Sequence, residues 1–579
     1  MKSVRILLLI IGTMVLLSAL VNAPREYNPE LSVRYSRDLV VILWALMATA
    51  RFRFASMVAG LATVLWTVAL VFEWVRSVGV TAMSQEPLLY DAFFLVGHLY
   101  NLMSDLMGTK ATMMFGGVVF SLVVIVLVTA WLFRRIQVQG CAVPRITRLA
   151  ACVLVLGVAV GVEHYEVAEG NNSLIDASNN MVESMAIREE IQRGISPNAY
   201  KDIRELRLTQ KPSVHIYIVE SYGNGIRRRS IRDDYYAMVD RLEGQLTEAG
   251  WFARTGLSEA PVMGGRSWLA DATLLSGRMV KYESVYRHLM PHLSSVTTLP
   301  SFFKANGYET ILMRHNDRER PGLPIRNFFD FEHTVHQLDV NYTGPSYGWA
   351  GIPDQYALGH LRDEVLPALW DSPHFVFTHL ASSHIPWDDV PPLLDDWREL
   401  NDQRGQKTGS QDAPLTEKQI KYQLKRFKRK ETVRLRRLKP SAENVRDYLR
   451  SVSYSMDAVV QHLLALDQPP DVVVIMGDHQ PPLYRSNTDF SVPIHVVSRD
   501  TEWLREFRKR GFRLGMRPPP MNKRIRHEGF FSIMVRSLAR AQDLPLPRYR
   551  TNGIKARSGA GASHRTGDGR SGTTRGEAQ

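Results

Sequence analysis

Cysteine is almost absent from this chain. Its 579 residues include two cysteines, Cys141 and Cys152, both within or beside the hydrophobic first third. The larger remainder has none, which excludes a disulfide framework there in any compartment. The chain also lacks the second glycine of a nucleophile elbow at Gly265-Arg266-Ser267-Trp268-Leu269, and this disfavours an α/β-hydrolase with an unaided Ser–His–Asp triad.

Charge is strongly one-sided. The net charge is +13 and the pI is about 9.6. The basic residues concentrate in loops beside hydrophobic runs, in one helical stretch and in the tail. This distribution favours a membrane surface or an anionic substrate, and we expect no nucleic-acid partner.

Long hydrophobic runs are plentiful in the first third and predict about five membrane spans. They are Ile6–Val21, Leu39–Ala50 (short for a span), Ala55–Val75, Met113–Phe133 and Ile146–Val162. Val21-Asn22-Ala23 resembles a signal-peptidase site, so cleavage of residues 1–23 is an alternative to the first span, although Pro24 disfavours it. Tyr90–Leu106 reads as an amphipathic helix at the membrane interface.

Basic loops predict the orientation. Lys2, Arg5, Arg51 and Arg134 favour the cytoplasm, so five spans place everything after Val162 outside. We expect a multi-pass protein of the cytoplasmic (inner) membrane with an extracytoplasmic catalytic domain. The predicted domains are a transmembrane domain at 1–165, a connector at 166–210, the catalytic domain at 211–545 and a disordered basic tail at 546–579.

The catalytic region alternates strands with helices. Predicted strands are Val214–Ser221, Tyr308–Met313, His374–His379 and the run from Asp471 to Met476, and helical spacing occupies Leu299–Asn306 and Val445–Leu466. This alternation predicts a doubly wound, mostly parallel α/β sheet.

Each predicted strand leads into polar groups that can bind a metal or a phosphate. These groups are Glu220, His315, His379 with His384, and Asp478 with His479. Ligands of such sheets lie beyond the carboxyl ends of the strands, and carboxylates with an imidazole suit a divalent metal. The alternative for Asp478 is a helix cap with a packed histidine beside it. Four groups at one sheet edge favour a site.

Ser267 is the candidate nucleophile. It follows Gly264 and Gly265, which let the backbone approach a ligand, and it precedes a helix whose free N–H groups attract an anion. An ordinary N-cap serine is the alternative. Thr273 and Ser276 compete but fall inside the apolar helix. A metal ion can activate a serine without a neighbouring base.

At these residues the chain resembles the sulfatase-like branch of the alkaline-phosphatase superfamily, and within it the membrane-anchored lipoteichoic-acid-synthase and phosphoglycerol-transferase group. The matching motifs are Val219-Glu220-Ser221, Gly264-Gly265-Arg266-Ser267-Trp268-Leu269, Gly307-Tyr308-Glu309-Thr310, Ser383-His384-Ile385-Pro386-Trp387 and Gly477-Asp478-His479-Gln480-Pro481-Pro482. The synthases carry a Thr-Ser pair where this chain has Arg266-Ser267. No cysteine stands there, so the formylglycine of true sulfatases cannot form.

The resemblance implies a metal-dependent, ping-pong transfer of a phospho-headgroup from an anionic phospholipid to a glycan or lipid hydroxyl. Glu220, Asp478 and His479 would bind one Mn²⁺ or Mg²⁺ ion (Zn²⁺ in the phosphoethanolamine branch), with Ser267 as nucleophile and further ligand. The substrate would be held by His384, His315 and Arg326, with Arg314, Arg318 and Arg320 as nearby alternatives to the arginine. A phosphoethanolamine transferase, a phosphate or sulfate ester hydrolase and a non-catalytic membrane scaffold are the alternative functions.

Thr416–Lys439 is densely basic with interleaved apolar residues. It predicts either a solvated helix face or a contact with anionic lipid headgroups.

Overall fold

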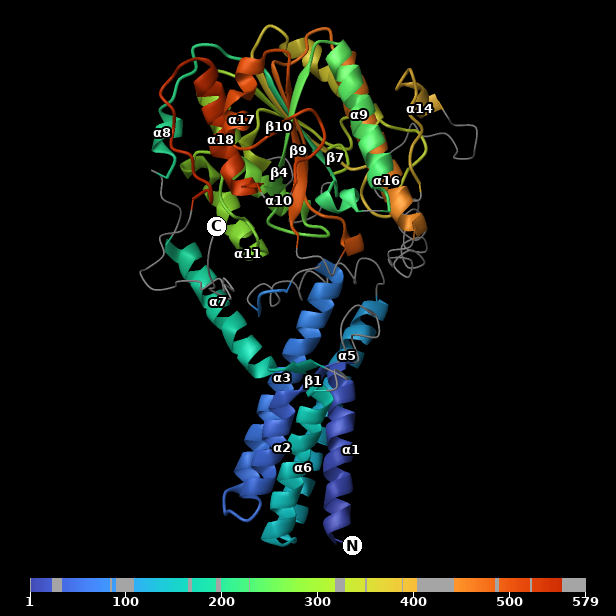
Figure 1. Cartoon of the computed structure of the whole chain (residues 1–579), viewed down its shortest axis with the longest axis vertical. Coiled ribbons are helices and arrows are strands. Elements are labelled where there is room, and N and C mark those ends of the chain that lie inside the picture. The colour runs from blue at the N-terminus through green and yellow to red at the C-terminus, as the bar shows by residue number, and fades with distance from the viewer. Residues whose placement is uncertain are drawn as a thin grey trace, which may run out of the picture.

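The computed structural model describes residues 2–22, 34–83, 86–89, 109–164, 169–193, 199–228, 230–317, 328–348, 351–387, 389–402, 442–484, 489–520 and 523–554. A bundle of long helices forms one end of the molecule and a domain built on a central sheet forms the other (Figure 1). We call these the helical domain and the α/β domain. Arg326, the basic stretch Thr416–Lys439, the interfacial segment Tyr90–Leu106 and the tail from 555 lie outside the described residues.

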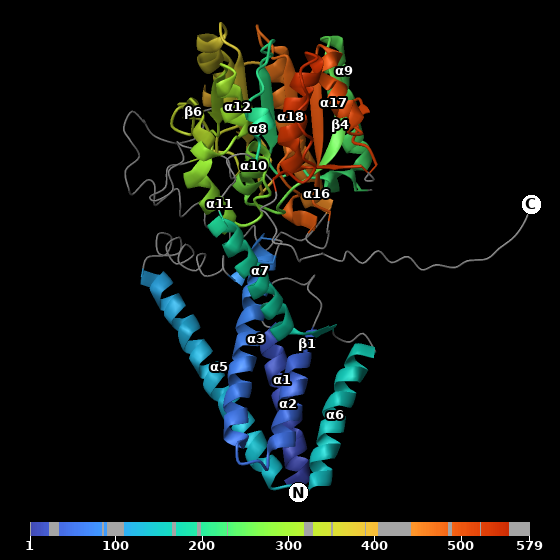
Figure 2. The same ribbon diagram turned by 90° about the vertical axis from the view of Figure 1, so that its left-hand side faces the viewer.

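The helical domain contains the predicted spans. Its helices are α1 (Lys2–Asn22), α2 (Arg37–Thr49), α3 (Ala55–Met83), α5 (Thr109–Cys141) and α6 (Arg145–His164). Within the described residues, three helices are long and apolar enough to cross a membrane, at Ser3–Val21, Ala55–Ser77 and Thr112–Cys141. The second and fifth predicted spans correspond to α2, which has 13 residues, and to α6, which has 20. The bundle opens toward the α/β domain, where α5 and α6 diverge (Figure 2).

One oblique helix, α7 (Ser173–Arg193), joins the two domains. At its start, Ser173 donates to the buried Glu73 of α3 (3.0 Å). Further along, Glu183 accepts a hydrogen bond from Tyr282 (2.6 Å), and Glu190 forms an ion pair with Arg278 (2.5 Å). Tyr282 and Arg278 belong to the α/β domain. The helix therefore contacts both domains, and it lies within the segment 166–210 that the sequence predicts as a connector.

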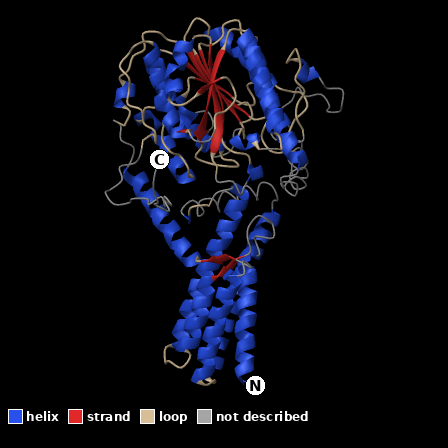
Figure 3. Ribbon diagram, in the orientation of Figure 1, coloured by secondary structure: helices blue, strands red, loops and turns tan. Residues whose placement is uncertain are grey.

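Within the described residues, the central sheet has nine strands in the order β10-β4-β9-β8-β3-β7-β5-β6, with β11 paired to β4 (Figure 3). The strands are β3 (Val214–Val219), β4 (Phe252–Glu259), β5 (Glu309–Met313), β6 (His333–Val335), β7 (His374–Leu380), β8 (Val472–Gly477), β9 (Ser491–Ser498), β10 (Arg513–Leu514) and β11 (Ile525–Arg526). The strands β8, β3, β7, β5 and β6 are parallel, whereas β9 is antiparallel to both β8 and β4. The mostly parallel α/β fold is confirmed.

Helices cover both faces of this sheet. Among them are α8 (Lys201–Arg204), α9 (Arg232–Glu248), α10 (Ser267–Ser276), α11 (Glu283–Leu289), α12 (Leu299–Ala305), α13 (Asp354–His360), α14 (Glu399–Asp402), α16 (Ala442–Leu464), α17 (Arg505–Lys509) and α18 (His527–Ala541). Alternate residues of β8 enter different cores: Val472, Val474 and Met476 join one cluster, and Val473 and Ile475 join the other. Burial on both faces explains why this strand reads as an unbroken apolar run.

The sheet is oriented with its functional edge toward the helical domain. The loop that follows β4 leads to α10, which lies with α11 on the side of the α/β domain nearer α3 and α7 (Figure 1). The carboxyl ends of the parallel strands β3, β7 and β8 meet at that edge, because parallel strands share one direction. Any site beyond these strand ends therefore faces the predicted membrane.

Candidate active site

Glu220 and Asp478 are brought together by the pairing of two central strands. Val219 of β3 lies opposite Gly477 of β8, so the residue that follows each strand emerges beside the other. A Cβ at position 477 would lie 1.9 Å from the carbonyl oxygen of Tyr222, so only glycine permits this close approach of the two strand ends. Two acidic side chains that are 258 positions apart in sequence thus become neighbours.

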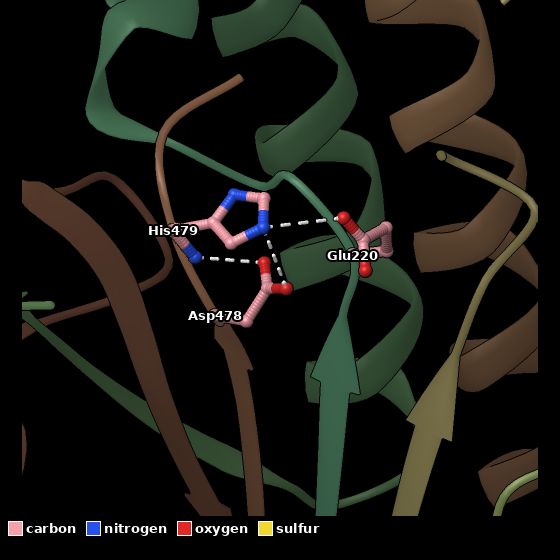
Figure 4. A group of neighbouring side chains, drawn as sticks. All are labelled: Glu220, Asp478 and His479. Atoms are coloured by element: carbon pink, nitrogen blue, oxygen red, sulfur yellow. Dashed lines mark hydrogen bonds and ion pairs between the residues drawn. The ribbon is translucent and has the colours of Figure 1, made fainter. Parts of the chain in front are cut away.

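The buried group of Glu220, Asp478 and His479 offers two carboxylates and an imidazole at one point. One ligand atom from each residue lies within 4.8 Å of the others, and Figure 4 shows the His479 ring between the two carboxylates. Nε2 of His479 is 3.4 Å from Oε1 of Glu220 and 3.3 Å from Oδ2 of Asp478. Nitrogen and oxygen donors at this spacing fit a divalent metal ion.

The backbone orients Asp478 and leaves one oxygen for a ligand. Its Oδ1 accepts hydrogen bonds from the backbone N–H groups of Ser221 and His479, each at 2.7 Å. Its Oδ2 is buried, with no hydrogen-bond partner among the described side chains and backbone groups. A buried, unsatisfied carboxylate oxygen costs free energy unless a cation or a proton occupies it. The chemistry of the donor set therefore fits a bound cation.

The two carboxyl groups have pKa values displaced in opposite directions. Burial raises the pKa of Glu220, but the charge of His479 and the hydrogen bond from His379 outweigh burial and hold it well below its usual value. For Asp478, burial and then the charge of Glu220 raise the pKa to about 7. Two buried carboxylates that repel each other provide a site that a divalent cation would stabilise.

Ser267 reaches this group from the other side. It is the first residue of α10, after Gly264 (φ 70°), Gly265 (φ 142°) and Arg266 (φ 66°), whose positive φ values turn the chain sharply. Its Oγ donates to Oε2 of Glu220 (2.7 Å) and lies 3.3 Å from Nε2 of His479. The free N–H groups at the start of α10 lie beside this hydroxyl, where they favour an anion.

The competing hydroxyls lie elsewhere. Thr273 and Ser276 are fully buried within α10, and each donates to the carbonyl four residues earlier. Among the described residues of the Gly264–Ser276 passage, Ser267 is therefore the hydroxyl that meets the acidic group.

His384 lies in the loop after β7, beside the same group. Its Nδ1 is 2.5 Å from the carbonyl of Ile385, and the neighbouring Ser383 donates to the carbonyl oxygen of Glu220 (2.7 Å). Burial lowers the pKa of His384, although the charge of Glu220 opposes it. The histidine is thus neutral at pH 7, and the loop that carries it is tied to the first strand end.

His315 is placed differently from the other predicted residues. It is fully buried, and its Nε2 lies 3.3 Å from Oδ1 of Asp354. Asp354 also accepts hydrogen bonds from the backbone of Ala381 and Ser382. Through Asp354, His315 therefore supports the loop that carries His384, and within the described residues no hydrogen bond or ion pair joins it to Glu220, Asp478 or His479.

His379, which the sequence analysis counted among the polar groups at the strand ends without a specific role, meets the acidic group directly. His379 of β7 contacts Glu220 through Nε2 (3.3 Å) and Asp271 of α10 through Nδ1 (3.0 Å). Arg314, weighed above only as an alternative to Arg326, lies 3.6 Å from Asp271 and 3.1 Å from Asp317. Their positions in the sequence could have indicated these residues. His379 lies near the end of a strand, and Asp271 follows Ser267 by one helical turn.

Comparisons with known proteins agree with this architecture. The family model described as Sulfatase matches residues 262–501. No curated protein matches the sequence.

Solved structures with a similar fold include three transferases or synthases. The lipoteichoic acid synthase LtaP from Listeria monocytogenes is 13% identical, over 62% of this chain and 81% of its own, with a TM-score of 0.35. The Streptococcus pyogenes phosphoglycerol transferase GacH is 15% identical, over 60% and 80%, with a TM-score of 0.35. The lipooligosaccharide phosphoethanolamine transferase A from Neisseria meningitidis is 13% identical, over 57% and 89%, with a TM-score of 0.36.

The family match spans the passage from Val262 to Thr501, which contains Ser267, His384, Asp478 and His479. The α/β domain of this chain thus contains a region that is similar to the Sulfatase family.

Proposed function

We propose that this protein is a metal-dependent transferase that moves a phospho-headgroup from an anionic phospholipid to a hydroxyl of a glycan or lipid. The transfer passes through a phosphoserine intermediate on Ser267. The observation that carries the proposal is the position of the Ser267 hydroxyl, 2.7 Å from Glu220 and 3.3 Å from His479, at the start of a helix.

Two displacements at phosphorus account for the transfer. In the first, Oγ of Ser267 forms a bond to phosphorus as the bond to the diacylglycerol oxygen breaks, and that oxygen leaves with a proton. In the second, the acceptor hydroxyl forms its bond to phosphorus, the bond to Oγ breaks, and the acceptor's proton leaves the new ester. Oγ of Ser267 takes up the proton that the acceptor lost, and the N–H groups at the start of α10 face the phosphoryl oxygens in both steps.

Glu220, Asp478 and His479, with Ser267, are the residues that would hold the divalent ion, Mn²⁺ or Mg²⁺, with Zn²⁺ as a further candidate. When bound, such an ion lowers the pKa of the serine hydroxyl and neutralises charge on the phosphoryl group. His384, His315 and Arg326 are proposed substrate residues. His384 is the one whose described loop is tied directly to Glu220, through Ser383.

The location of the site supports a lipid donor. Helix α10, whose first residue Ser267 contacts Glu220, lies on the side of the α/β domain nearer the helical domain (Figure 1). A headgroup at a bilayer surface would therefore lie on the side from which Ser267 is approached. We propose that the helical domain is a multi-pass anchor in the cytoplasmic membrane, with the α/β domain outside it.

The test uses the purified full-length protein in detergent, incubated with phosphatidylglycerol and MnCl₂ and analysed by mass spectrometry. We expect a phosphoglycerol adduct on the peptide that contains Ser267 and none in Ser267→Ala. Thr273→Ala is the matched control and should keep the adduct.

Each other outcome has a distinct meaning. An adduct from phosphatidylethanolamine alone would contradict the anionic donor and indicate a phosphoethanolamine transferase. Release of glycerol phosphate into water, undiminished by any hydroxyl acceptor, would indicate a hydrolase. Absence of an adduct from every phospholipid, with the metal bound, would contradict the proposal and favour a scaffold.

A further inference from the structure

Behind Glu220 lies a buried pair formed by Asp271 and His379, which we call the Asp271–His379 pair. The Asp271 side chain is 0% exposed and the His379 side chain 6%. They come from different elements, α10 and β7, and are 108 positions apart in sequence. A charged or polar pair this deep must be satisfied by its neighbours, so its contacts define what it does.

The histidine ring is held at both nitrogens by carboxylates. Nδ1 lies 3.0 Å and 3.2 Å from the two oxygens of Asp271. Nε2 lies 3.3 Å from Oε2 of Glu220 and 3.9 Å from Oδ2 of Asp478. Because Asp271 fixes one side of the ring, the other nitrogen has a set direction toward Glu220.

Asp271 is itself anchored. It lies one turn after Ser267 in α10, so the helix that presents the nucleophile also presents this carboxylate. Arg314 lies 3.6 Å from Oδ2 of Asp271, the same oxygen that Nδ1 of His379 approaches at 3.0 Å. Four side chains contact one another in succession, and their formal charges alternate when His379 is protonated. They are Arg314, Asp271, His379 and Glu220.

We propose that the Asp271–His379 pair is a positioning element that fixes the Glu220 carboxylate for cation binding, and so sets the metal affinity of the site. This inference rests on the proposed function, because it needs a divalent cation at Glu220, Asp478 and His479. Outer partners that hold metal ligands typically change metal affinity by about 10- to 100-fold when removed. His379 acts here through Glu220 and is not itself one of the proposed ligands.

The alternative is that the pair only stabilises the fold, as many buried ion pairs do. The two roles predict different results. A structural role lowers stability and leaves the affinity of the folded protein unchanged. A positioning role lowers metal affinity in a protein that is still folded.

The experiment measures Mn²⁺ affinity of the full-length protein in detergent by isothermal titration calorimetry, and the bound ion by electron paramagnetic resonance. His379→Leu removes both ring nitrogens and should weaken Mn²⁺ binding about 10- to 100-fold. His379→Gln keeps a donor that can reach Glu220 and should recover most of the affinity. Asp271→Asn, which keeps the shape of the side chain, should fall between them and broaden the Mn²⁺ signal.

His462→Leu is the matched control, because His462 is a buried histidine of α16, away from the acidic group. It should bind Mn²⁺ as the unmodified protein does. Equal affinity in His379→Leu, Asp271→Asn and the control would overturn the positioning role alone. If the unmodified protein binds neither Mn²⁺ nor Zn²⁺, the proposed function fails, and the inference with it. Should His379→Leu fail to fold, Asp271→Asn decides.

Discussion

Buried histidines lie at both edges of the central sheet, and the comparison separates the effect of burial from that of charge. At the carboxyl edge, burial lowers the pKa of His379, but Asp271 and Glu220 outweigh it and raise the pKa well above its usual value. At the amino edge, His215 of β3 is equally enclosed, and burial together with His374 and His462 drives its pKa far down. Neighbouring carboxylates therefore decide which buried histidine is charged.

The difference has a functional consequence. At the carboxyl edge, Glu220, Asp478 and Asp271 surround His379 and His479. Burying these charges together costs free energy unless a bound cation or substrate offsets it. At the amino edge, the rings of His215 and His374 lie 5.1 Å apart, and His215 contacts the Tyr217 hydroxyl at 2.9 Å. We expect changes at the first edge to affect turnover and changes at the second to affect stability.

The largest expected effect tests the carboxyl edge. Glu220→Gln removes the charge that pairs with His479 and His379, so turnover of phosphatidylglycerol should fall by about 10³-fold or more. Headgroup release measured by mass spectrometry checks this, with circular dichroism as the folding control. A variant that retains a tenth of the turnover would contradict the assigned role of Glu220.

The second prediction concerns acid unfolding. Burial lowers the pKa of His462 and His495 to about 3, below the ordinary value of about 6.5. The unfolded state therefore binds more protons than the folded state between these values, and stability falls as the pH decreases from about 6.5 toward 3. Each histidine should contribute about 1.4 kcal/mol per pH unit. Denaturant unfolding of the metal-free protein from pH 7.5 to 5 measures the slope, and a flat profile would contradict the assigned neutral state.

The third prediction concerns metal binding and pH. The pKa of Asp478 in the metal-free protein is raised to about 7, and a ligand must lose its proton before it binds a cation. Mn²⁺ affinity should therefore fall by about tenfold per pH unit below 7 and level off above it. Calorimetry at pH 6, 7 and 8 checks this. Constant affinity across the range would show that Asp478 is already ionised at pH 6.

The smallest effect is expected from His462→Leu. At pH 7 the ring is neutral and buried, so its replacement by an apolar side chain should change the free energy of unfolding by less than about 1.5 kcal/mol. Its signature is the acid slope, which should become shallower by the contribution of one histidine. An unchanged slope would assign the acid sensitivity to other groups.

Strands that contain a continuous run of residues favourable to β-structure could be predicted from the sequence. The strands β3 and β8 are runs rich in β-branched residues, and the structure contains both within two residues of the expected limits. The strand β9 was missed because it contains Pro493 and His495. It is a buried antiparallel strand whose pairing with β4 no local pattern indicates. The strand β4 carries Gly256 and charged residues, and it is held in the sheet by its pairing with β9, β10 and β11.

The predicted site depended on the topology rather than on any single motif. Parallel strands share an edge, so Glu220, Asp478 and His479 could be grouped once their strands were recognised. The contact between Asp271 and His379 could not, because it depends on how α10 packs against β7. Likewise, the fully buried position of His315 against Asp354 follows from the packing of α13, which sequence spacing does not reveal.

Leu88 follows the α3 helix, yet it is 1% exposed and belongs to the apolar cluster that contains Val214, Leu274 and Phe531 of the α/β domain. Nearby, Asn180 of α7 hydrogen-bonds both Leu89 and Pro87. A fragment that begins after α7 would lack Leu88, and the apolar side chains that pack against Leu88 would become exposed to solvent. Anyone who wishes to crystallise that fragment alone should first replace the neighbouring apolar side chains with polar ones.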